Sequence, residues 1–230
     1  MFPWQIISKL LSLNFVYKLD FYCDAKKILD EYYNWNAKNK LFDKGVRESN
    51  GLGGVCLYSE DGKSNSFNKE KDIDTVPTEV INYFTYTHTI IKSLIKKFDC
   101  YPRRIRLLVL KKNSKLNWHI DWDESYKHGN CRLHIPILIN DKCFGNLCHQ
   151  EYRWKPGELW YGEYSFPHQV VNYGDSDRLH LVLDFKYAKN LFPDQIEYET
   201  DEIKRRKYRK LIMFFFNFFY LYPMKLVYKK

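Results

Sequence analysis

The hydrophobic pattern of this chain changes to a period of two near residue 104 and keeps it to about residue 185. Successive side chains of a β-strand point to opposite faces of a sheet, so a period of two indicates strands. Turn-forming residues at 140–141, 155–157 and 174–175 divide the region into short segments. Short strands that alternate with turns predict a double-stranded β-helix, or jelly roll. The expected strands are 106–111, 118–121, 132–139, 144–147, 158–162, 168–173 and 178–184.

The N-terminal half has a different pattern. Apolar residues recur at helical spacing in 24–35 and 77–98, with Pro77 near the start of the second segment, so we expect two helices there. The Gly-, Ser- and charge-rich stretch 50–74 predicts loops around a short strand at 55–58. The expected fold class is therefore mainly β, with helices packed outside a jelly-roll core.

Length and charge indicate how the chain is divided. A chain of 230 residues suits one domain with a buried core. We expect this domain at 1–190, with a helical part at 1–100 and the jelly roll at 101–190, followed by a basic and aromatic tail at 191–230. The net charge is +9, and 186–230 carries +6 of it, with 11 Lys or Arg against 5 Asp or Glu. The near-neutral remainder argues against a nucleic-acid partner.

The tail combines a basic segment with an apolar one. Six of the seven residues in 204–210 are Lys or Arg, and the 14-residue run 211–224 is mostly Phe, Tyr and Leu. That run is too short to cross a bilayer as a helix. Two interpretations stay open: a helix docked on the outside of the jelly roll, or peripheral contact with a membrane surface through 204–224.

Polar residues occupy positions i and i+2 of three expected strands. Because such positions share one face of a strand, each pair must face either solvent or a common interior. Three such pairs on otherwise apolar strands favour an interior lined by polar side chains. The pairs are His119 with Asp121, Arg132 with His134, and Arg178 with His180.

His119, Asp121 and His168 form a candidate metal site. A His-x-Asp pair on one strand can hold one ion, and a histidine from a second strand completes one face of an octahedron. Two imidazoles and one carboxylate are the ligands of non-haem iron(II) oxygenases, whose other positions stay open for substrate and dioxygen. The sequence therefore predicts an iron(II) site.

Arg178 lies ten residues after His168. Residues 170–175 predict a strand end and a turn, so a hairpin would return Arg178 to the level of His168. A guanidinium there can form a two-pronged pair with a carboxylate. An iron triad with a returning arginine is the layout of a 2-oxoglutarate-dependent oxygenase.

Residues 104–185 resemble the aspartyl/asparaginyl β-hydroxylase family, in the broad sense that includes free-proline hydroxylases. The motifs that carry the resemblance are 130–136 (NCRLHIP), 154–161 (WKPGELWY), 165–168 (SFPH) and the strand 177–184. The resemblance implies a cupin-like jelly roll and Fe(II) held by His119, Asp121 and His168. It also implies that Arg178 binds the distal carboxylate of 2-oxoglutarate.

Asp121 separates branches of that family. The vertebrate-type aspartyl hydroxylases lack the carboxylate ligand and bind iron with two histidines, whereas the proline-hydroxylase branch keeps it. Asp121 therefore implies a complete triad and argues against peptidyl aspartate as the substrate. It also argues against a halogenase, which needs that ligand position empty for halide.

Arg132 and His134 have two interpretations. The family uses this strand to contact 2-oxoglutarate and the carboxylate of the substrate, which would assign both residues to ligand binding. The alternative is a structural pair between Arg132 and Asp184 or Glu158. We favour ligand binding.

The remaining histidines and cysteines give weaker evidence for a functional site. We expect His88 to pack on a helix and His128 to be solvated, and Cys143, Cys148 and His149 have no evident fourth ligand for zinc. The six cysteines follow no disulfide framework, and without a secretory signal at the start they fit a cytoplasmic location. The residues expected to wall the barrel are Trp118, Trp122, Trp154 and Trp160.

The sequence thus predicts an iron(II)- and 2-oxoglutarate-dependent dioxygenase, which uses O2 to hydroxylate an amino acid, free or in a peptide. The alternatives are a catalytically silent jelly-roll binding module and an oxygenase that acts on nucleic acid. The intact triad and Arg178 argue against the first alternative, and the near-neutral body argues against the second.

Overall fold

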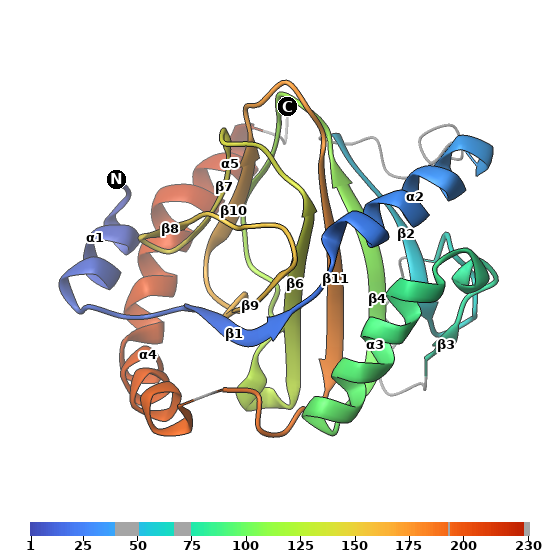
Figure 1. The fold of residues 1–230 in the computed structure, drawn as a ribbon. Helices are drawn as coiled ribbons and strands as arrows, with labels where there is room; N and C mark the ends of the chain where they lie inside the picture. Colours follow the sequence, from blue (N-terminus) through green and yellow to red (C-terminus); the bar gives the residue numbers. More distant parts are fainter. Residues whose placement is uncertain (40–50, 67–74, 193, 228–230) are drawn as a thin grey trace.

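Two antiparallel β-sheets face each other in the computed structural model, and helices flank them (Figure 1). The structure describes residues 1–39, 51–66, 75–192 and 194–227. The strands are β1 (Val16–Tyr22), β2 (Leu52–Ser59), β3 (Val76–Pro77), β4 (Tyr101–Leu110), β5 (Ser114–His119), β6 (Asn130–Leu138), β7 (Cys143–Leu147), β8 (Gln150–Tyr152), β9 (Glu158–Gly162), β10 (His168–Asn172) and β11 (Arg178–Lys186). The larger sheet has the order β1-β9-β6-β11-β4-β2-β3, and the smaller has the order β5-β10-β7-β8. This arrangement confirms the predicted jelly-roll class.

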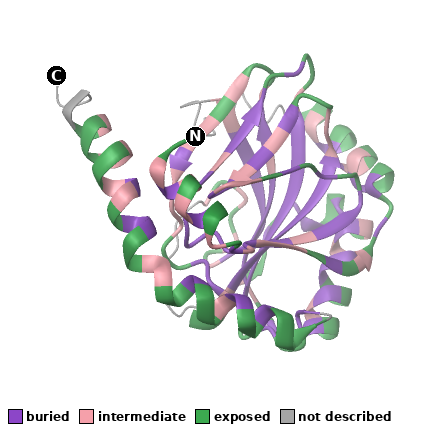
Figure 2. Cartoon of the chain, turned by 90° about the vertical axis from the view of Figure 1, so that its left-hand side faces the viewer, coloured by how far each residue is buried: buried purple, intermediate pink, exposed green. Residues whose placement is uncertain are grey.

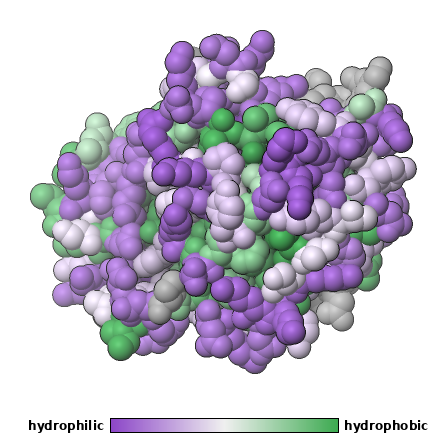
Figure 3. All heavy atoms as spheres, viewed as in Figure 1, coloured by the Kyte–Doolittle hydropathy of each residue, from purple (hydrophilic) through white to green (hydrophobic). Residues whose placement is uncertain are grey.

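Helices lie on two sides of this sandwich. They are α1 (Pro3–Leu10), α2 (Ala25–Asn39), α3 (Thr85–Phe98), α4 (Gln195–Phe216) and α5 (Tyr222–Val227), and a π-helical turn at Asn217–Leu221 joins α4 to α5. In Figure 1, α2 and α3 lie together over the larger sheet, while α1 and α4 pack against each other on the opposite side of the molecule. Charged and polar side chains cover most of the face seen in Figure 3, with hydrophobic atoms showing between them.

A carboxylate links α2 to α3. α2 buries an apolar face that includes Ile28 and Trp35. From the same helix, Glu31 accepts hydrogen bonds from the backbone N–H groups of Tyr86 (2.5 Å) and Thr87 (3.0 Å) in the first turn of α3. A carboxylate at a helix N-terminus satisfies free N–H groups and complements the helix dipole. The two helices are therefore fixed to each other as well as to the sheet.

β11 is buried on both faces, and the two faces differ in chemistry. Leu181 and Leu183 belong to the hydrophobic cluster under α2 and α3. Arg178 and Val182 point the other way and line a cavity between the two sheets. The alternation that predicted strands thus also separates an apolar outer layer from a polar interior.

The N-terminal half differs from its predicted helical character. β1 pairs with β9 and β2 pairs with β4, so residues before 100 complete the larger sheet as well as covering it. The helix expected at 77–98 begins only at Thr85, after a 3-10 turn at Ile81–Tyr83, and Pro77 lies in β3. Pro77 pairs with Tyr58 of β2, so the backbone there is extended and the helix begins later. Of the loop region expected at 50–74, residues 50 and 67–74 lie outside the described residues.

The predicted hairpin between 168–173 and 178–184 is wrong. β10 pairs with β5 and β7, whereas β11 pairs with β4 and β6, so the connection crosses between the sheets. The side-chain amide of Asn172 fixes this crossing by donating to the carbonyls of Leu110 (3.1 Å) and Ser176 (3.0 Å). Arg178 consequently faces His168 from the opposite sheet, and both side chains line the same cavity.

Candidate active site

Three potential metal ligands converge at the ends of β5 and β10. His119 and His168 are direct partners in the antiparallel register, and their ring centroids are 4.1 Å apart. Asp121 lies two residues beyond the end of β5 rather than on the strand as expected, and its backbone N–H donates to the carbonyl of Tyr164 (3.0 Å). One potential ligand atom from each of the three side chains lies within 4.8 Å of the others. No second such cluster of His, Cys, Asp or Glu occurs in the part of the chain that the structure describes.

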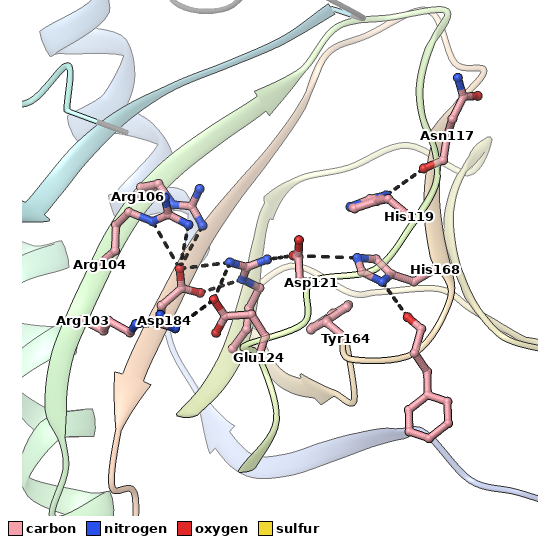
Figure 4. Close-up of polar contacts among 12 residues, drawn as sticks. Arg103, Arg104, Arg106, Asn117, His119, Asp121, Glu124, Tyr164, His168 and Asp184 are labelled. Atoms are coloured by element: carbon pink, nitrogen blue, oxygen red, sulfur yellow. Dashed lines mark hydrogen bonds and ion pairs between the residues drawn. The ribbon is translucent and has the colours of Figure 1, made fainter. Parts of the chain in front are cut away.

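Backbone carbonyls set the tautomers of both histidines. The Nδ1–H of His119 donates to the carbonyl of Asn117 (2.7 Å), as Figure 4 shows. The Nδ1–H of His168 donates to the carbonyl of Phe166 (2.9 Å). Each Nε2 therefore keeps its lone pair, which is the usual arrangement behind a metal-binding imidazole. The Nε2 of His168 already points at Asp121, whose Oδ2 is 3.9 Å away.

Burial keeps His168 in the form that a metal needs. Burial lowers the pKa of His168 to about 3, and the neighbouring His119 ring acts in the same direction. An imidazole with this pKa is neutral across the physiological range and available as a ligand. The donor set of two imidazoles and one carboxylate fits a divalent first-row metal such as iron(II).

A cavity enclosed by the described residues lies beside the triad. Its volume is about 340 Å³, and its wall includes the three triad residues together with Arg178 and His134. A cavity of this size suits a small organic ligand. A small molecule in this cavity therefore lies next to the triad side chains and Arg178.

Arg178 is buried without a carboxylate among the described residues that pairs with it. Its Nη2 donates to Nδ1 of His180 (2.7 Å), and its guanidinium lies over the Trp154 ring at 5.0 Å. Burial and the charge of Arg178 lower the pKa of both His180 and His134 well below the ordinary value, so both rings are neutral and add no further positive charge beside Arg178.

Several polar atoms around Arg178 have no partner. The Nε of Arg178 and the Nε2 atoms of His134 and His180 are buried without hydrogen bonds. Leaving each such group unsatisfied costs about 1–3 kcal/mol. A carboxylate of a bound ligand beside Arg178 would accept from its unpartnered Nε–H and reduce this penalty.

Arg132 lies within a buried network of carboxylates. Its Nε donates to Asp184 Oδ1 (2.6 Å), its Nη2 donates to Glu124 (3.1 Å), and its Nη1 pairs with Asp121. The pairing with Asp184 is the structural alternative that the sequence left open, whereas Glu158 pairs with Lys18 instead. Arg132 therefore holds Asp121, the candidate carboxylate ligand, and the contact of Arg132 with a cosubstrate stays a prediction.

The sequence reading missed two arginines of the cavity. Arg104 and Arg106 of β4 line its wall, and both pair with Asp184. They form a further polar i, i+2 pair, which the expected strand start at 106 concealed. Trp122 was assigned to the barrel wall wrongly, because its side chain is 58% exposed.

The other expectations have mixed outcomes. His128 is exposed, as predicted, and His88 is half-buried with its Nε2 2.9 Å from the hydroxyl of Tyr58. Trp118 and Trp154 are buried as expected of wall residues. No helix among the described residues has the length and apolar character required to cross a membrane.

Residues 24–187 match the family described as aspartyl/asparaginyl beta-hydroxylase, and this match covers more than half of the chain. The chain belongs to this family. The predicted family is thereby confirmed.

Similarity to an individual curated protein is low and covers only part of the chain. This aspartyl/asparaginyl beta-hydroxylase family protein is 28% identical over 93 residues to L-proline cis-4-hydroxylase of Rhizobium meliloti (strain 1021), which covers 39% of this chain and 32% of that protein. The chain thus spans about a third of the length of this curated relative.

Solved structures share the architecture. An oxidoreductase of the 2OG-Fe(II) oxygenase family from Burkholderia pseudomallei is similar with a TM-score of 0.50 and 10% identity, over 83% of this chain and 93% of that chain. A prolyl hydroxylase from Trichoplax adhaerens, solved with a hypoxia inducible factor peptide fragment, has a TM-score of 0.49 and 12% identity over 80% and 93% of the two chains. At such identities the first likeness supports the fold class and nothing finer.

Proposed function

We propose that the protein is an iron(II)- and 2-oxoglutarate-dependent dioxygenase that hydroxylates an amino acid, free or within a peptide. The observation that carries this proposal is one cavity with two complementary ends. One end holds the triad of His119, Asp121 and His168, and the other holds the buried Arg178 without a carboxylate partner among the described residues. Family membership and the similarity to L-proline cis-4-hydroxylase support the same substrate class.

Different residues would bind the metal and 2-oxoglutarate. His119, Asp121 and His168 would hold the metal, and Arg178 would hold the distal carboxylate of 2-oxoglutarate. Bound iron and 2-oxoglutarate supply the oxidising chemistry, in which R–H, O2 and 2-oxoglutarate become R–OH, succinate and carbon dioxide. The protein contributes the orientation of the ligands and a cavity from which bulk water is largely excluded.

Arg132 and Tyr164 would keep the triad in place. Arg132 pairs with Asp121 from β6, and the carbonyl of Tyr164 accepts from the Asp121 backbone. These contacts fix a ligand that lies on a loop instead of a strand, and supporting contacts of this kind set the precision of a metal site.

The test is a screen of purified protein with iron(II), 2-oxoglutarate and O2 against free amino acids and blocked peptides. The proposal expects stimulated succinate release by at least one amino acid or peptide, with a product heavier by one oxygen atom. Stimulation by oligonucleotides alone would favour the nucleic-acid alternative. A folded, iron-loaded protein that converts no 2-oxoglutarate would favour the silent binding module.

We propose further that residues 1–190 form the catalytic unit and that 191–230 stabilise it by packing against it. The side chains that line the cavity all come from the first of these segments. α4 supports it from outside, because Arg209 donates to the hydroxyl (3.0 Å) and the carbonyl (3.0 Å) of Ser165, shortly before His168. The tail thus stabilises the loop that leads into a ligand.

For the end of the tail we propose peripheral contact with an anionic membrane surface. Phe214, Phe218 and Tyr222 follow one another at i+4 spacing and are 60%, 57% and 61% exposed. Lys210 and Lys207 precede Phe214 by about one and two turns and are exposed. Figure 2 shows this end of the helix standing away from the body. Exposed aromatics beside Lys suit a lipid interface, where each basic residue contributes about 1 kcal/mol.

Vesicle sedimentation tests this contact. Wild-type protein should bind vesicles of phosphatidylcholine with phosphatidylserine, and the double variant Phe214→Ser/Phe218→Ser should lose most of that binding. Tyr22→Ser removes an aromatic that is 73% exposed elsewhere and serves as the control. Equal binding by the double variant and the wild type, or no binding by either, would contradict the membrane contact.

A further inference from the structure

Helix α1 presents apolar side chains on the side that faces away from the body. Trp4 and Ser8 are buried on its inner side. Phe2, Ile6 and Leu10 follow one another at i+4 spacing and form a stripe on the outer side. Ile6 is 45% exposed and Leu10 is 79% exposed. The inner side explains how α1 is held on the fold, whereas the outer stripe contributes little to that packing.

Exposed aliphatic and phenylalanine side chains are concentrated in two short segments. Among the described residues, eleven Met, Phe, Ile, Leu and Val side chains are exposed, and eight of them lie within 1–10 and 211–219. Elsewhere the exposed large hydrophobic residues are mostly tyrosines, whose hydroxyl groups suit contact with water. Apolar groups that gather on a surface in this way mark an interaction site.

The two segments belong to helices that touch each other. Trp4 of α1 meets the rings of Phe216 (5.1 Å) and Tyr220 (6.0 Å) edge to face. α1 and α4 lie together on the left-hand side of the molecule in Figure 1, and Figure 2 turns that side toward the viewer. The exposed residues of 1–10 and 211–222 therefore belong to one side of the molecule, which we call the α1–α4 face.

The charge of the α1–α4 face indicates what covers it. No Asp or Glu occurs in 1–19 or in 203–230, and Lys9, Lys207 and Lys210 are exposed next to the apolar stripes. A second copy of the chain would bring like charges together, and a nucleic acid would leave the apolar stripes exposed to water. An anionic membrane surface matches both the charge and the apolar groups.

We propose that α1 is a second membrane-contact segment, which lies on an anionic lipid surface together with the end of α4. This inference rests on the membrane contact proposed for the tail, and it adds a contact from a different helix. A single short apolar segment binds a bilayer only marginally, whereas two segments on one body bind with a shared loss of translational freedom. Two contacts also fix how the jelly roll is oriented on the lipid surface.

Sedimentation of the full chain with vesicles of phosphatidylcholine and phosphatidylserine tests the apolar part. Ile6→Ser/Leu10→Ser should lower the partition coefficient by roughly ten-fold, because two aliphatic side chains lose their burial among lipids. Val76→Ser/Ile196→Ser is the matched control, since these side chains are 46% and 78% exposed outside the α1–α4 face. The control should bind as the wild type does. All four residues are exposed, so circular dichroism should show an unchanged fold in both variants.

A second variant tests the electrostatic part. Lys9→Glu should lower binding to the same vesicles by roughly ten- to thirty-fold, because it reverses a charge near the anionic surface. The loss should shrink at high salt, which screens the interaction. Lys92→Glu is the control, because Lys92 is exposed on α3 at the other side of the molecule, and this variant should bind as the wild type does.

The outcomes separate α1 from the tail. If the two α1 variants bind as the wild type does while Phe214→Ser/Phe218→Ser is impaired, the role of α1 is overturned and the contact of the tail stands. If the wild type binds no vesicles, the membrane contact of the tail fails as well. A wild type that is dimeric in analytical ultracentrifugation without lipid, and monomeric as Ile6→Ser/Leu10→Ser, would assign the α1–α4 face to a second copy and contradict the proposal.

Discussion

At the scale of single residues, Asp184 determines how the interior of the jelly roll is charged. Its side chain is fully buried, and burial alone would raise the pKa of its carboxyl group. The guanidinium groups of Arg132, Arg106 and Arg104 outweigh burial and hold the pKa of Asp184 well below the ordinary value. A buried ion cluster of this kind is costly to break, because removal of one partner leaves the others uncompensated.

Asp184→Asn should therefore lower the free energy of unfolding by about 3–5 kcal/mol at neutral pH. Because the folded pKa is depressed, the contribution of Asp184 is complete above its unfolded pKa near 4 and is lost as the pH falls through the folded value. The difference between wild type and variant should then shrink below about pH 4. Urea unfolding across pH measures both effects.

The control for this prediction is Asp177→Asn. Asp177 pairs with Lys111 at 3.2 Å, but both side chains are partly exposed, so the change should stay within about 1 kcal/mol. If Asp184→Asn were no more destabilising than this control, the buried cluster would not have the energetic importance assigned to it.

Arg178 has a role that is separable from metal binding. Arg178→Ala removes the buried cation at the far end of the cavity and should weaken 2-oxoglutarate binding by about 2–5 kcal/mol. Iron binding should change far less, since the three ligand side chains make no contact with Arg178 that fixes them. Calorimetric titration with each ligand distinguishes the two. Equal losses in both titrations, or an unchanged affinity for 2-oxoglutarate, would contradict the assignment.

At the scale of secondary-structure elements, α4 is docked along one side and exposed along the other. Phe216 is fully buried and meets the Trp4 ring of α1 edge to face at 5.1 Å. Arg205 is also fully buried and donates to the carbonyl of Asn14 and to the hydroxyl of Tyr17 (2.8 Å). The docked interpretation of the tail thus applies to most of α4, and the proposed membrane contact concerns its far end.

Two phenylalanines on this helix give a matched pair for stability. Phe216→Ala should lower the free energy of unfolding by about 3–5 kcal/mol, because a large buried side chain is removed. Phe218→Ala should change it by less than about 0.5 kcal/mol, because that ring is 57% exposed. Chemical denaturation of both variants measures the difference. Similar values for the two would mean that α4 is not packed on the body as the structure has it.

Much of the β-sandwich was predictable, because alternation is a local property of the chain. The strand expected at 158–162 coincides with β9, and most of the others differ from the observed strands by a few residues. Pairing between strands is not local, and there the predictions were wrong: a tight turn after 168–173 was as consistent with a hairpin as with the observed crossing between sheets. The cross-sheet bonds of Asn172 have no signature in the sequence.

In the candidate site, too, local patterns were predictable and contacts between strands were not. His119, Asp121, His168 and Arg178 carried enough local pattern to be singled out, although Asp121 lies beyond its strand and is held there by Tyr164 and Arg132. Arg104 and Arg106 of β4 and Arg132 of β6 all pair with Asp184 of β11, so this cluster is assembled from three different strands. Such a charge balance emerges only when those strands are placed side by side.

At the scale of the whole molecule, the two sheets contribute different parts of the candidate site. The smaller sheet brings His119 and His168 together through β5 and β10, and the larger sheet supplies the arginines through β4, β6 and β11. α2 and α3 cover one side of this sandwich, while α1 and α4 cover another, so the metal ligands and the cationic wall are held by separately supported layers (Figure 1). The cavity lies between these two layers, so the proposed metal ligands and the arginines can act on the same bound molecule.

The most direct test of this account is conversion of 2-oxoglutarate to succinate by chelator-treated protein, with and without added iron(II), in the wild type and in His119→Ala. The wild type should convert 2-oxoglutarate only after iron(II) is restored. His119→Ala should fall by at least about a hundred-fold with its fold intact by circular dichroism, since loss of one of three ligands costs several kcal/mol. Conversion that is indifferent to iron(II), or a His119→Ala variant as active as the wild type, would contradict the central claim.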